Sequence, residues 1–226
     1  MKKPQIELVI RDMDNLTLNT EWIYFNATAQ IFMESAEIEL TDEMYDEMLG
    51  KPGAEIAKTV IPQYCLQITF DDYMARREEL ALEIISKGPV EPMHFARESL
   101  EYSLAERVLN CFATAAIQSE ALLKLQVAGL MKYGVSLFSQ SDIDLTGPKS
   151  DLFILASGVL GIQPSRCLVY EDTSVGALEA QAAGMHCIAV PSSKKETDFG
   201  NALVYPNLEA AHNDLANNFE MVPSRS

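Results

Sequence analysis

Near its N-terminus the chain reads Ile6-Glu7-Leu8-Val9-Ile10-Arg11-Asp12-Met13-Asp14. This short and mostly apolar run is typical of a strand that is buried on both faces of a parallel sheet. Such sheets bind their ligands outside the carboxyl ends of the strands, which is where Asp12 and Asp14 follow. Two carboxylates this close repel each other unless a cation or a shared proton relieves them. The pair is therefore typical either of a Mg²⁺ site in which one Asp is a nucleophile, or of a solvated acidic turn.

The composition is that of a globular protein. The chain has 226 residues, 48% of them hydrophobic, which suffices for one large domain or for a domain with a smaller insertion. No stretch approaches the roughly 20 apolar residues of a membrane span. The opening Met1-Lys2-Lys3-Pro4 lacks the apolar region of a signal peptide, so we expect a cytoplasmic protein. Four scattered cysteines without a Cys-x-x-Cys pair indicate reduced thiols, not a disulfide framework or a zinc site.

The formal net charge of −16 restricts the possible partners. Nucleic acids and anionic membranes bind basic surfaces, so we expect neither as a partner. A small phosphorylated substrate is not excluded, because Mg²⁺, a Lys and backbone N–H groups can reverse the sign of the field inside one pocket. We expect such a small-molecule phosphate ester as the partner, and a monomer or a homodimer.

The segment that follows the first strand is almost entirely helical. Cap residues and apolar spacing predict helices over about 20–35, 42–50, 53–61 and 71–86, with no convincing strand between them. Gly88-Pro89-Val90-Glu91-Pro92 then indicates a return hinge. We expect residues 18–88 to form a helical cap domain that is inserted into a core domain made of residues 1–17 and 89–226.

Strands and helices alternate through the rest of the chain. Apolar runs predict strands over about 108–113, 135–138, 167–170 and 187–190, separated by helices over about 95–104, 119–128, 150–160 and 175–183. This alternation is typical of βαβ units in a doubly wound parallel sheet, an α/β fold of the Rossmann-like kind. The last twenty residues are expected to form a surface helix over 208–215 and a loose tail.

Three of these strands end in residues that suit phosphate chemistry. Asp12 and Asp14 follow the first strand, Thr114 ends the strand over 108–113, and Glu171 with Asp172 ends the strand over 167–170. Parallel strands place their carboxyl ends on one edge, so these side chains should converge. A carboxylate cluster suits Mg²⁺, which prefers oxygen ligands. Lys149 lies in a loop that should meet the same edge, where it could hold phosphoryl oxygens.

These residues resemble the motifs of a known family. Asp12-Met13-Asp14 matches an Asp-x-Asp first motif, Thr114 a second motif in which Ser or Thr ends a strand, and the run from Glu171 to Gly184 a fourth motif with its helix. Leu49-Gly50 resembles a turn in the caps of relatives. The chain therefore resembles the haloacid dehalogenase (HAD) superfamily, in its phosphatase and β-phosphoglucomutase-like branch with a helical cap. The likeness spans nearly the whole chain in the correct order, and it disfavours a merely solvated turn.

The resemblance implies a HAD-type phosphoric monoester hydrolase with Mg²⁺ as its cofactor. It implies that Asp12 attacks phosphorus to form an aspartyl-phosphate, and that Asp14 protonates the leaving oxygen and then activates water. Mg²⁺ would be held by Asp12, Asp14 and Asp172, with Glu171 acting through water. Thr114 and Lys149 would neutralise the transferring group. Substrate contacts are expected from Thr114, Ala115 and Lys149, and from Lys51 of the cap.

The sequence departs from the family pattern at three places. The third motif of the family begins with Lys four residues before Asp151, where this chain has Gly147, and Lys149 stands two residues later. We expect the long side chain of Lys149 to reach the phosphate nonetheless. Asn15 replaces a usual Gly, which Asn can do if the backbone is left-handed there. Arg11 replaces a usually aromatic residue and, if buried, is expected to need a carboxylate partner.

The sequence therefore favours one function over two others. The leading hypothesis is a Mg²⁺-dependent phosphatase for a small phosphorylated metabolite, such as a sugar phosphate. A catalytically weak or silent relative that binds a phosphorylated ligand or a protein is supported by the three departures. A phosphohexomutase is disfavoured, because Gly53 stands where the mutases carry a cap Arg.

Overall fold

The computed structural model describes residues 2–49, 51, 53–143, 147–193, 195 and 197–224. The chain divides into an α/β unit, Met1–Asn19 with Glu91–Ser226, and a helical unit, Thr20–Val90. Both boundaries fall two residues later than the expected 18–88. The reason is local pairing, because Leu18 forms a bridge with Pro92 and the N–H of Asn19 donates to the carbonyl of Glu91 over 2.9 Å. The two connecting segments thus lie side by side within the α/β unit.

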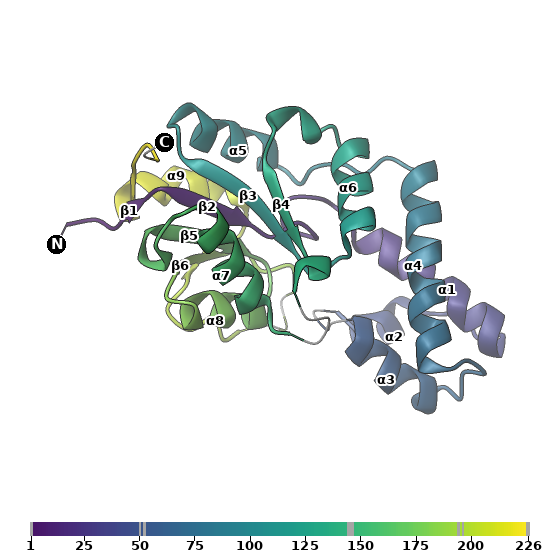
Figure 1. Cartoon of the computed structure of the whole chain (residues 1–226). Coiled ribbons are helices and arrows are strands. Elements are labelled where there is room, and N and C mark those ends of the chain that lie inside the picture. The colour runs from purple at the N-terminus through teal and green to yellow at the C-terminus, as the bar shows by residue number, and fades with distance from the viewer. Residues whose placement is uncertain are drawn as a thin grey trace. The chain divides into compact units, whose positions relative to one another are not determined.

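A parallel sheet is the centre of the α/β unit (Figure 1). Within the described residues it has six strands in the order β4-β3-β2-β5-β6-β7, and all neighbours are parallel. The strands are β2 (Leu8–Arg11), β3 (Leu109–Thr114), β4 (Ser136–Ser139), β5 (Cys167–Glu171), β6 (His186–Ala189) and β7 (Leu203–Val204). In register, Arg11 lies opposite Phe112 of β3 and Tyr170 of β5. The predicted doubly wound α/β fold is confirmed, and β2 stands in the middle of its sheet.

Helices cover both faces of this sheet (Figure 1). Side chains alternate along a strand, so Leu8 and Ile10 of β2 pack with α7 and α8, whereas Val9 packs with α9 on the opposite face. The helices are α5 (Ala96–Ala105), α6 (Gln118–Val127), α7 (Lys149–Val159), α8 (Ser174–Ala182) and α9 (Leu208–Asn218). Short 3₁₀ helices are η1 (Met131–Tyr133), η2 (Gln140–Asp142) and η3 (Pro164–Arg166). The apolar burial on both faces explains why the strands are almost continuously hydrophobic.

The C-terminal segment contains the predicted helix, as α9, but the tail beyond it is not loose. Leu208, Ala211 and Leu215 of α9 are buried in the core on one face of the sheet, and Phe219 is buried beside them. Beyond the helix, β8 (Glu220–Met221) pairs in parallel with β1 (Gln5–Ile6). Strands of two residues carry no readable periodicity, so the prediction missed this pairing of the two ends of the chain.

The helical unit contains α1 (Glu21–Ala36), α2 (Asp42–Asp46), α3 (Gly53–Gln63) and α4 (Phe70–Lys87). The side chains of Thr41 and Thr69 cap α2 and α4 by accepting from backbone N–H groups. The helix predicted over 42–50 is shorter than expected, and Gly50 lies outside the described residues. The largest fully buried side chains of this unit's core are Tyr73 and Phe32.

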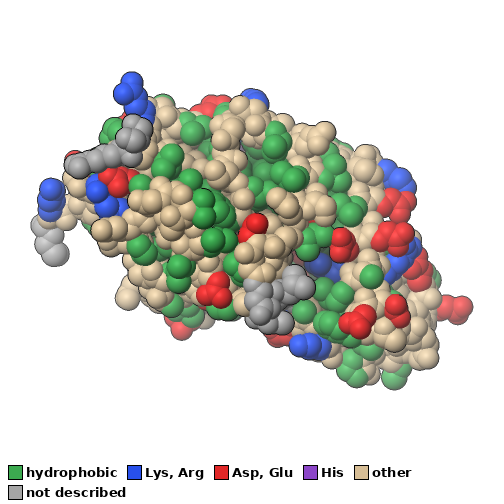
Figure 2. All heavy atoms as spheres, in the orientation of Figure 1, with side chains coloured by type: hydrophobic (Ala, Val, Ile, Leu, Met, Phe, Trp, Pro, Cys, Tyr) green, Lys and Arg blue, Asp and Glu red, His purple; other side chains and the backbone are tan. Residues whose placement is uncertain are grey.

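The surface carries many acidic side chains, and the four cysteines are free thiols. Acidic side chains are spread over the face of the molecule in Figure 2, in keeping with the net charge of −16. Cys111, Cys167 and Cys187 are buried free thiols, and Cys65 is an exposed one. Within the described parts of the chain, no helix has the length and hydropathy needed to cross a membrane.

Candidate active site

Asp12 and Asp14 stand where β2 ends, in a turn that the backbone fixes. The N–H of Asp12 donates to the carbonyl of Tyr170 over 2.9 Å, which continues the pairing with β5 by one residue. The hydroxyl of Thr17 donates to the carbonyl of Asp12 over 2.6 Å. Asn15 has φ = +56°, and its N–H donates to the carbonyl of Leu18 over 2.9 Å. The backbone at Asn15 is left-handed, which is the condition under which Asn can take the place of the usual Gly.

Glu171 is the last residue of β5 and Asp172 follows it, next to that turn, and both residues are buried. The hydroxyl of Thr173 donates to Oε2 of Glu171 and accepts from the N–H of Gly176, each over 3.1 Å, so it caps α8 and holds the carboxylate at once. Gly176 makes this approach possible, because a Cβ at that position would lie 2.3 Å from the carboxylate carbon of Glu171. The carboxylate therefore lies against the backbone of the first turn of α8, an N-terminal position that favours negative charge.

Lys149 joins these two strand ends. Its Nζ forms an ion pair with Oδ1 of Asp12 and another, over 2.5 Å, with Oε1 of Glu171. Lys149 is the first residue of α7, and the next N–H, that of Ser150, donates to the carboxylate of Glu179 in α8 over 3.1 Å. The start of α7 is thus tied to α8. Residues 144–146 of the preceding loop lie outside the described residues.

The carboxylates of Asp12, Glu171 and Asp172 form a compact group that fits a divalent cation. One oxygen from each lies within 4.8 Å of the others, and all three residues are buried. Burial, with the nearby charges of Glu171 and Asp14, raises the pKa of Asp12 to about 7 in spite of Lys149. Burial and the charge of Asp12 likewise raise the pKa of Asp172 well above its usual value. Raised values mean that negative charge here lacks compensation, and buried oxygen donors of this kind suit Mg²⁺.

The carboxylates around Lys149 change the pKa of its ammonium as well. Burial alone would lower the pKa of its ammonium, but the carboxylates of Asp12 and Glu171 outweigh that effect and raise it. Lys149 is therefore a permanent cation at this edge of the sheet. The lysine that seemed displaced in the sequence lies beside the candidate nucleophile.

Asp14 has its own set of partners. The hydroxyl of Thr114, at the end of β3, accepts from the N–H of Ala116 over 3.0 Å and donates to Oδ2 of Asp14 over 3.3 Å. Lys124 of α6 donates to Oδ1 of Asp14 over 2.6 Å. Sequence reasoning missed Lys124, although the buried positions Ala121 and Leu125 of α6 indicate that it lies on the inward face of that helix.

Two further residues, Ala115 and Lys51, are expected to contact the substrate. Ala115 is exposed and directly follows β3. Lys51 is exposed in the helical unit, where it lines a small cavity of about 60 Å³ with residues of α2, α3 and the loop between them. Their role toward a substrate stays a prediction.

Arg11 is buried, but the expected carboxylate partner is wrong. Among the described residues its guanidinium donates to neutral groups: to the hydroxyl of Ser99 over 3.0 Å, to the carbonyl of the same residue over 2.9 Å, and to the hydroxyl of Ser103 over 3.0 Å. A longer contact of 3.4 Å reaches the amide oxygen of Asn110, and the ring of Tyr170 lies 4.9 Å from the guanidinium carbon. Hydrogen bonds and a ring face satisfy this cation in place of a carboxylate.

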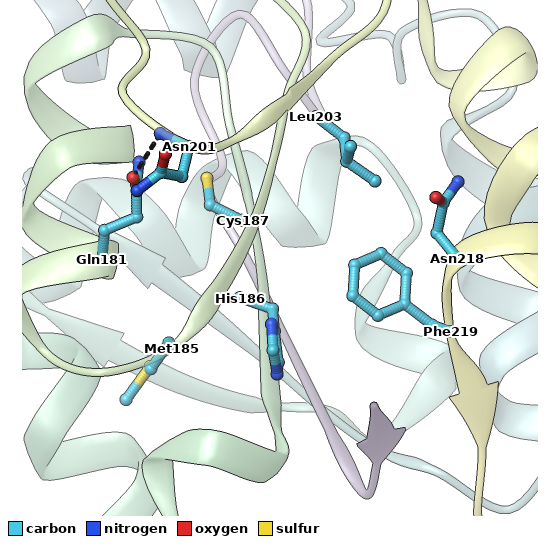
Figure 3. A pocket seen from close by; sticks show the side chains of 8 residues that line it. All are labelled: Gln181, Met185, His186, Cys187, Asn201, Leu203, Asn218 and Phe219. Carbon is cyan, nitrogen blue, oxygen red and sulfur yellow. Dashed lines mark hydrogen bonds between the residues drawn. The ribbon is translucent and has the colours of Figure 1, made fainter. Parts of the chain in front are cut away.

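A larger cavity lies elsewhere on the α/β unit (Figure 3). It has a volume of about 410 Å³ and lies at the amino end of β6, whereas the candidate site follows carboxyl ends. Its amides are already engaged: that of Gln181 donates to two backbone carbonyls, and that of Asn218 donates to Asp214 and Tyr205. The lining residues are Gln181, Met185, His186, Cys187, Asn201, Leu203, Asn218 and Phe219.

The family can now be stated. A family model described as haloacid dehalogenase-like hydrolase matches residues 9–190, which include both Asp12 and Asp172. The chain belongs to this family. The predicted family resemblance is confirmed.

Two named relatives of this HAD hydrolase are phosphatases. The "Probable pseudouridine-5'-phosphatase" of Drosophila melanogaster is 29% identical over 189 residues, which cover 81% of this chain and 80% of that protein. The "Phosphorylated carbohydrates phosphatase" of Thermotoga maritima is 25% identical over 187 residues, which cover 81% and 84%. As in these relatives, the chain is an enzyme of the phosphoric monoester hydrolase type.

A solved structure agrees on the fold of this HAD hydrolase. CbbY from Rhodobacter sphaeroides, a structure in complex with phosphate, aligns with a TM-score of 0.80 at 17% identity and covers 91% of this chain and 96% of that one. At this identity the likeness bears on the fold alone.

Proposed function

We propose that this HAD hydrolase is a Mg²⁺-dependent phosphatase of a small phosphorylated metabolite, such as a sugar phosphate, and that it works through an aspartyl-phosphate. The observation that carries the proposal is the contact of Lys149 with both Asp12 and Glu171, beside the buried carboxylate of Asp172. This group combines a candidate nucleophile, a permanent cation and a cation site within one edge of the sheet. Phosphoryl transfer depends mainly on such positioning and charge neutralisation.

The chemistry has two balanced steps. In the first, a carboxylate oxygen of Asp12 bonds to phosphorus, the bond from phosphorus to the ester oxygen breaks, and the leaving oxygen takes a proton from Asp14. In the second, a water oxygen bonds to phosphorus and gives its proton to Asp14, while the bond to Asp12 breaks and inorganic phosphate leaves. Lys149 and Thr114 would neutralise and orient the phosphoryl oxygens. Both protein residues end the cycle as they began it.

The residues that would hold Mg²⁺ are the side chains of Asp12 and Asp172 and the backbone carbonyl of Asp14, with Glu171 acting through water. Buried oxygen donors within 4.8 Å of one another support this assignment. When bound, the ion supplies positive charge that relieves the repulsion between the carboxylates and draws the phosphoryl group toward Asp12. Lys149 would then compensate the negative charge of the carboxylates that the metal does not neutralise.

The substrate class rests on the named relatives and on the helical unit. The relatives' printed substrates are a nucleoside 5'-phosphate and phosphorylated carbohydrates, two kinds of small sugar-containing phosphate ester. We assign the helical unit, Thr20–Val90, the role of a cap that selects the substrate and excludes water, with Lys51 as a substrate contact. The exposed ammonium of Lys51 is suited to a polar or anionic group.

The rival hypotheses have less support. The displaced lysine is one support for a silent relative, yet Lys149 contacts Asp12. A phosphohexomutase would need an Arg where Gly53 stands. Hydrolysis is therefore the better proposal.

The experiment is hydrolysis of p-nitrophenyl phosphate with Mg²⁺ and after chelation, for the wild type, Asp12→Asn and the control Asp71→Asn, which changes an exposed residue of α4. We expect turnover that requires the metal, disappears in Asp12→Asn and survives in Asp71→Asn. A panel of pseudouridine 5'-phosphate and hexose phosphates then ranks substrates by kcat/KM. Turnover that persists in Asp12→Asn would refute the nucleophile, and an inactive wild type would favour the silent relative.

A further inference from the structure

A lysine without solvent access stands behind the candidate acid–base residue. Lys124, near the C-terminal end of α6, has a relative exposure of 0%. Its Nζ lies 2.6 Å from Oδ1 of Asp14 and 2.6 Å from Oε1 of Glu120. Glu120 is one helical turn earlier on the same helix and is itself buried. One ammonium thus joins two carboxylates that come from α6 and from the turn after β2.

Packing alone does not call for a charge at this position. The neighbours on the same face of α6, Ala121, Leu125 and Ala128, are apolar and buried. An apolar side chain at position 124 would continue this stripe, and apolar replacements of buried ion pairs often fold as well as the pairs. Burying an ammonium is unfavourable unless it is paired, which Lys124 achieves with two partners. The charge thus serves two contacts, one with Oε1 of Glu120 and one with Oδ1 of Asp14.

We propose that Lys124, held in place by Glu120, is a positioning residue that orients the carboxyl group of Asp14 for proton transfer to the leaving oxygen. The inference rests on the proposed phosphatase function and adds two residues to it. Lys124 has no exposed surface through which a substrate could reach it. It acts through Asp14.

The geometry distinguishes the two oxygens of Asp14. Oδ1 accepts from the buried Lys124 over 2.6 Å, whereas Oδ2 meets the hydroxyl of Thr114 over a longer 3.3 Å. The side chain of Asp14 is 22% exposed, so the carboxyl group is reachable from one side while Lys124 anchors the other. Oδ2 is therefore the oxygen that carries the proton to the ester oxygen as the bond to phosphorus breaks, and that later takes a proton from water. A rotation of the carboxyl group would spoil this transfer, and Lys124 prevents it.

The leaving group offers a selective test. A good leaving group such as p-nitrophenolate departs with little help from an acid, whereas an alkoxide needs the proton in the transition state. For Lys124→Met, which keeps an unbranched side chain one atom shorter and removes the charge, we expect kcat/KM to fall about 10-fold on p-nitrophenyl phosphate and about 10²–10³-fold on an alkyl phosphate such as glycerol phosphate. Measured over a series of phenyl phosphates, the dependence of log kcat/KM on leaving-group pKa becomes steeper than in the wild type. A merely structural role would lower kcat/KM by the same factor for all substrates.

Two further variants complete the experiment. Leu125→Ala removes a buried apolar side chain from the same helix and should lower thermal stability while leaving the leaving-group dependence unchanged. Glu120→Gln removes the charge that holds Lys124, so it should steepen the dependence by less than Lys124→Met, and it decides the question if Lys124→Met does not fold. An unchanged dependence in the charge variants, with an active wild type, overturns the inference and leaves the phosphatase standing. A wild type without turnover on the whole series overturns the proposed function and this inference with it.

Discussion

Lys149 forms an ion pair with Asp12, although 137 positions separate them in the chain. Asp12 follows the central strand β2, and Lys149 opens α7, the helix that packs on the same face as Ile10. The topology of the sheet brings them together, because β2, β3 and β4 are parallel and present their carboxyl ends at one edge, and α7 follows β4 in the chain. The cation therefore belongs to the group that would carry the chemistry.

This contact predicts the effect of removing the cation. Lys149→Met should lower kcat on p-nitrophenyl phosphate by about 10²–10³-fold, because the transferring phosphoryl group loses a preorganised positive partner. Steady-state kinetics with saturating Mg²⁺ would measure this. Lys87→Met, which removes an exposed lysine of the helical unit, is the matched control and should keep its kcat. A kcat for Lys149→Met within threefold of wild type would show that the ion pair is only structural.

The cluster of Asp12, Glu171 and Asp172 predicts that the stability of the metal-free protein depends on pH, and that a bound metal reverses this dependence. The pKa of Asp12 is about 7 in the fold, mainly through burial, and about 3.9 in an unfolded chain. Between these values the folded protein without metal binds more protons than the unfolded chain, so its free energy of unfolding falls as the pH rises from about 4 to 7. The raised pKa of Asp172 acts in the same sense.

Thermal unfolding with chelator and with Mg²⁺ at pH 5.5 and pH 8 would measure this linkage. We expect Mg²⁺ to raise Tm at pH 8 by roughly 5–10 °C, since a few kcal/mol shifts a domain of this size by about that much, and to raise it less at pH 5.5. Asp12→Asn removes the titrating group and should reduce the difference between the two pH values. An equal effect of Mg²⁺ at both values would contradict the linkage.

Most of the fold can be predicted from the sequence, because the strands of the sheet have local sequence patterns that identify them. Apolar runs such as Cys167–Tyr170 are long enough to identify a strand, and each polar residue at a strand end marks the same edge. The side chains expected there do lie together: Asp12, Glu171, Asp172 and Lys149, with Asp14 and Thr114 in contact beside them. Their chemical roles stay predictions that the kinetics above test.

What the sequence does not reveal depends on partners that are distant or neutral. Lys124 on a helix is indistinguishable from a solvated lysine until the face of α6 that packs inward is known. Arg11 was expected to need a carboxylate, but hydroxyl groups of α5 satisfy it. The pairing of Gln5 with Glu220 uses strands too short to show a period. In each case the deciding information is a tertiary contact.

The neutral partners of Arg11 predict an energetic coupling. Ser99→Ala removes the hydroxyl that accepts from the guanidinium over 3.0 Å, and leaving a buried charged donor unmatched costs about 1–3 kcal/mol. In an Arg11→Met background the same substitution should cost much less, because no guanidinium remains to be satisfied. Urea unfolding of the four proteins in this cycle gives the coupling free energy. Equal costs in both backgrounds would mean that Ser99 stabilises α5 independently of Arg11.

The last prediction concerns Gly176, which has no Cβ and therefore leaves room for the carboxylate of Glu171. A Cβ there would lie 2.3 Å from both Cδ and Oε2 of a carboxylate that is fully buried, so the carboxylate would have to move. Gly176→Ala should therefore lower the free energy of unfolding by about 1–3 kcal/mol, as overpacking does, and weaken the effect of Mg²⁺ on Tm.

Gly158 of α7 is the matched control. Nothing lies within 4 Å of a Cβ at that exposed helical position, so Gly158→Ala should raise stability by about 0.5–1 kcal/mol through helix propensity alone. Both changes add the same methyl group inside a helix, which leaves the contact with Glu171 as the difference between them. In a Glu171→Ala background the cost of Gly176→Ala should largely disappear. If Gly176→Ala instead stabilises the protein as Gly158→Ala does, the carboxylate of Glu171 is not held against α8, and the placement of the cation site fails with it.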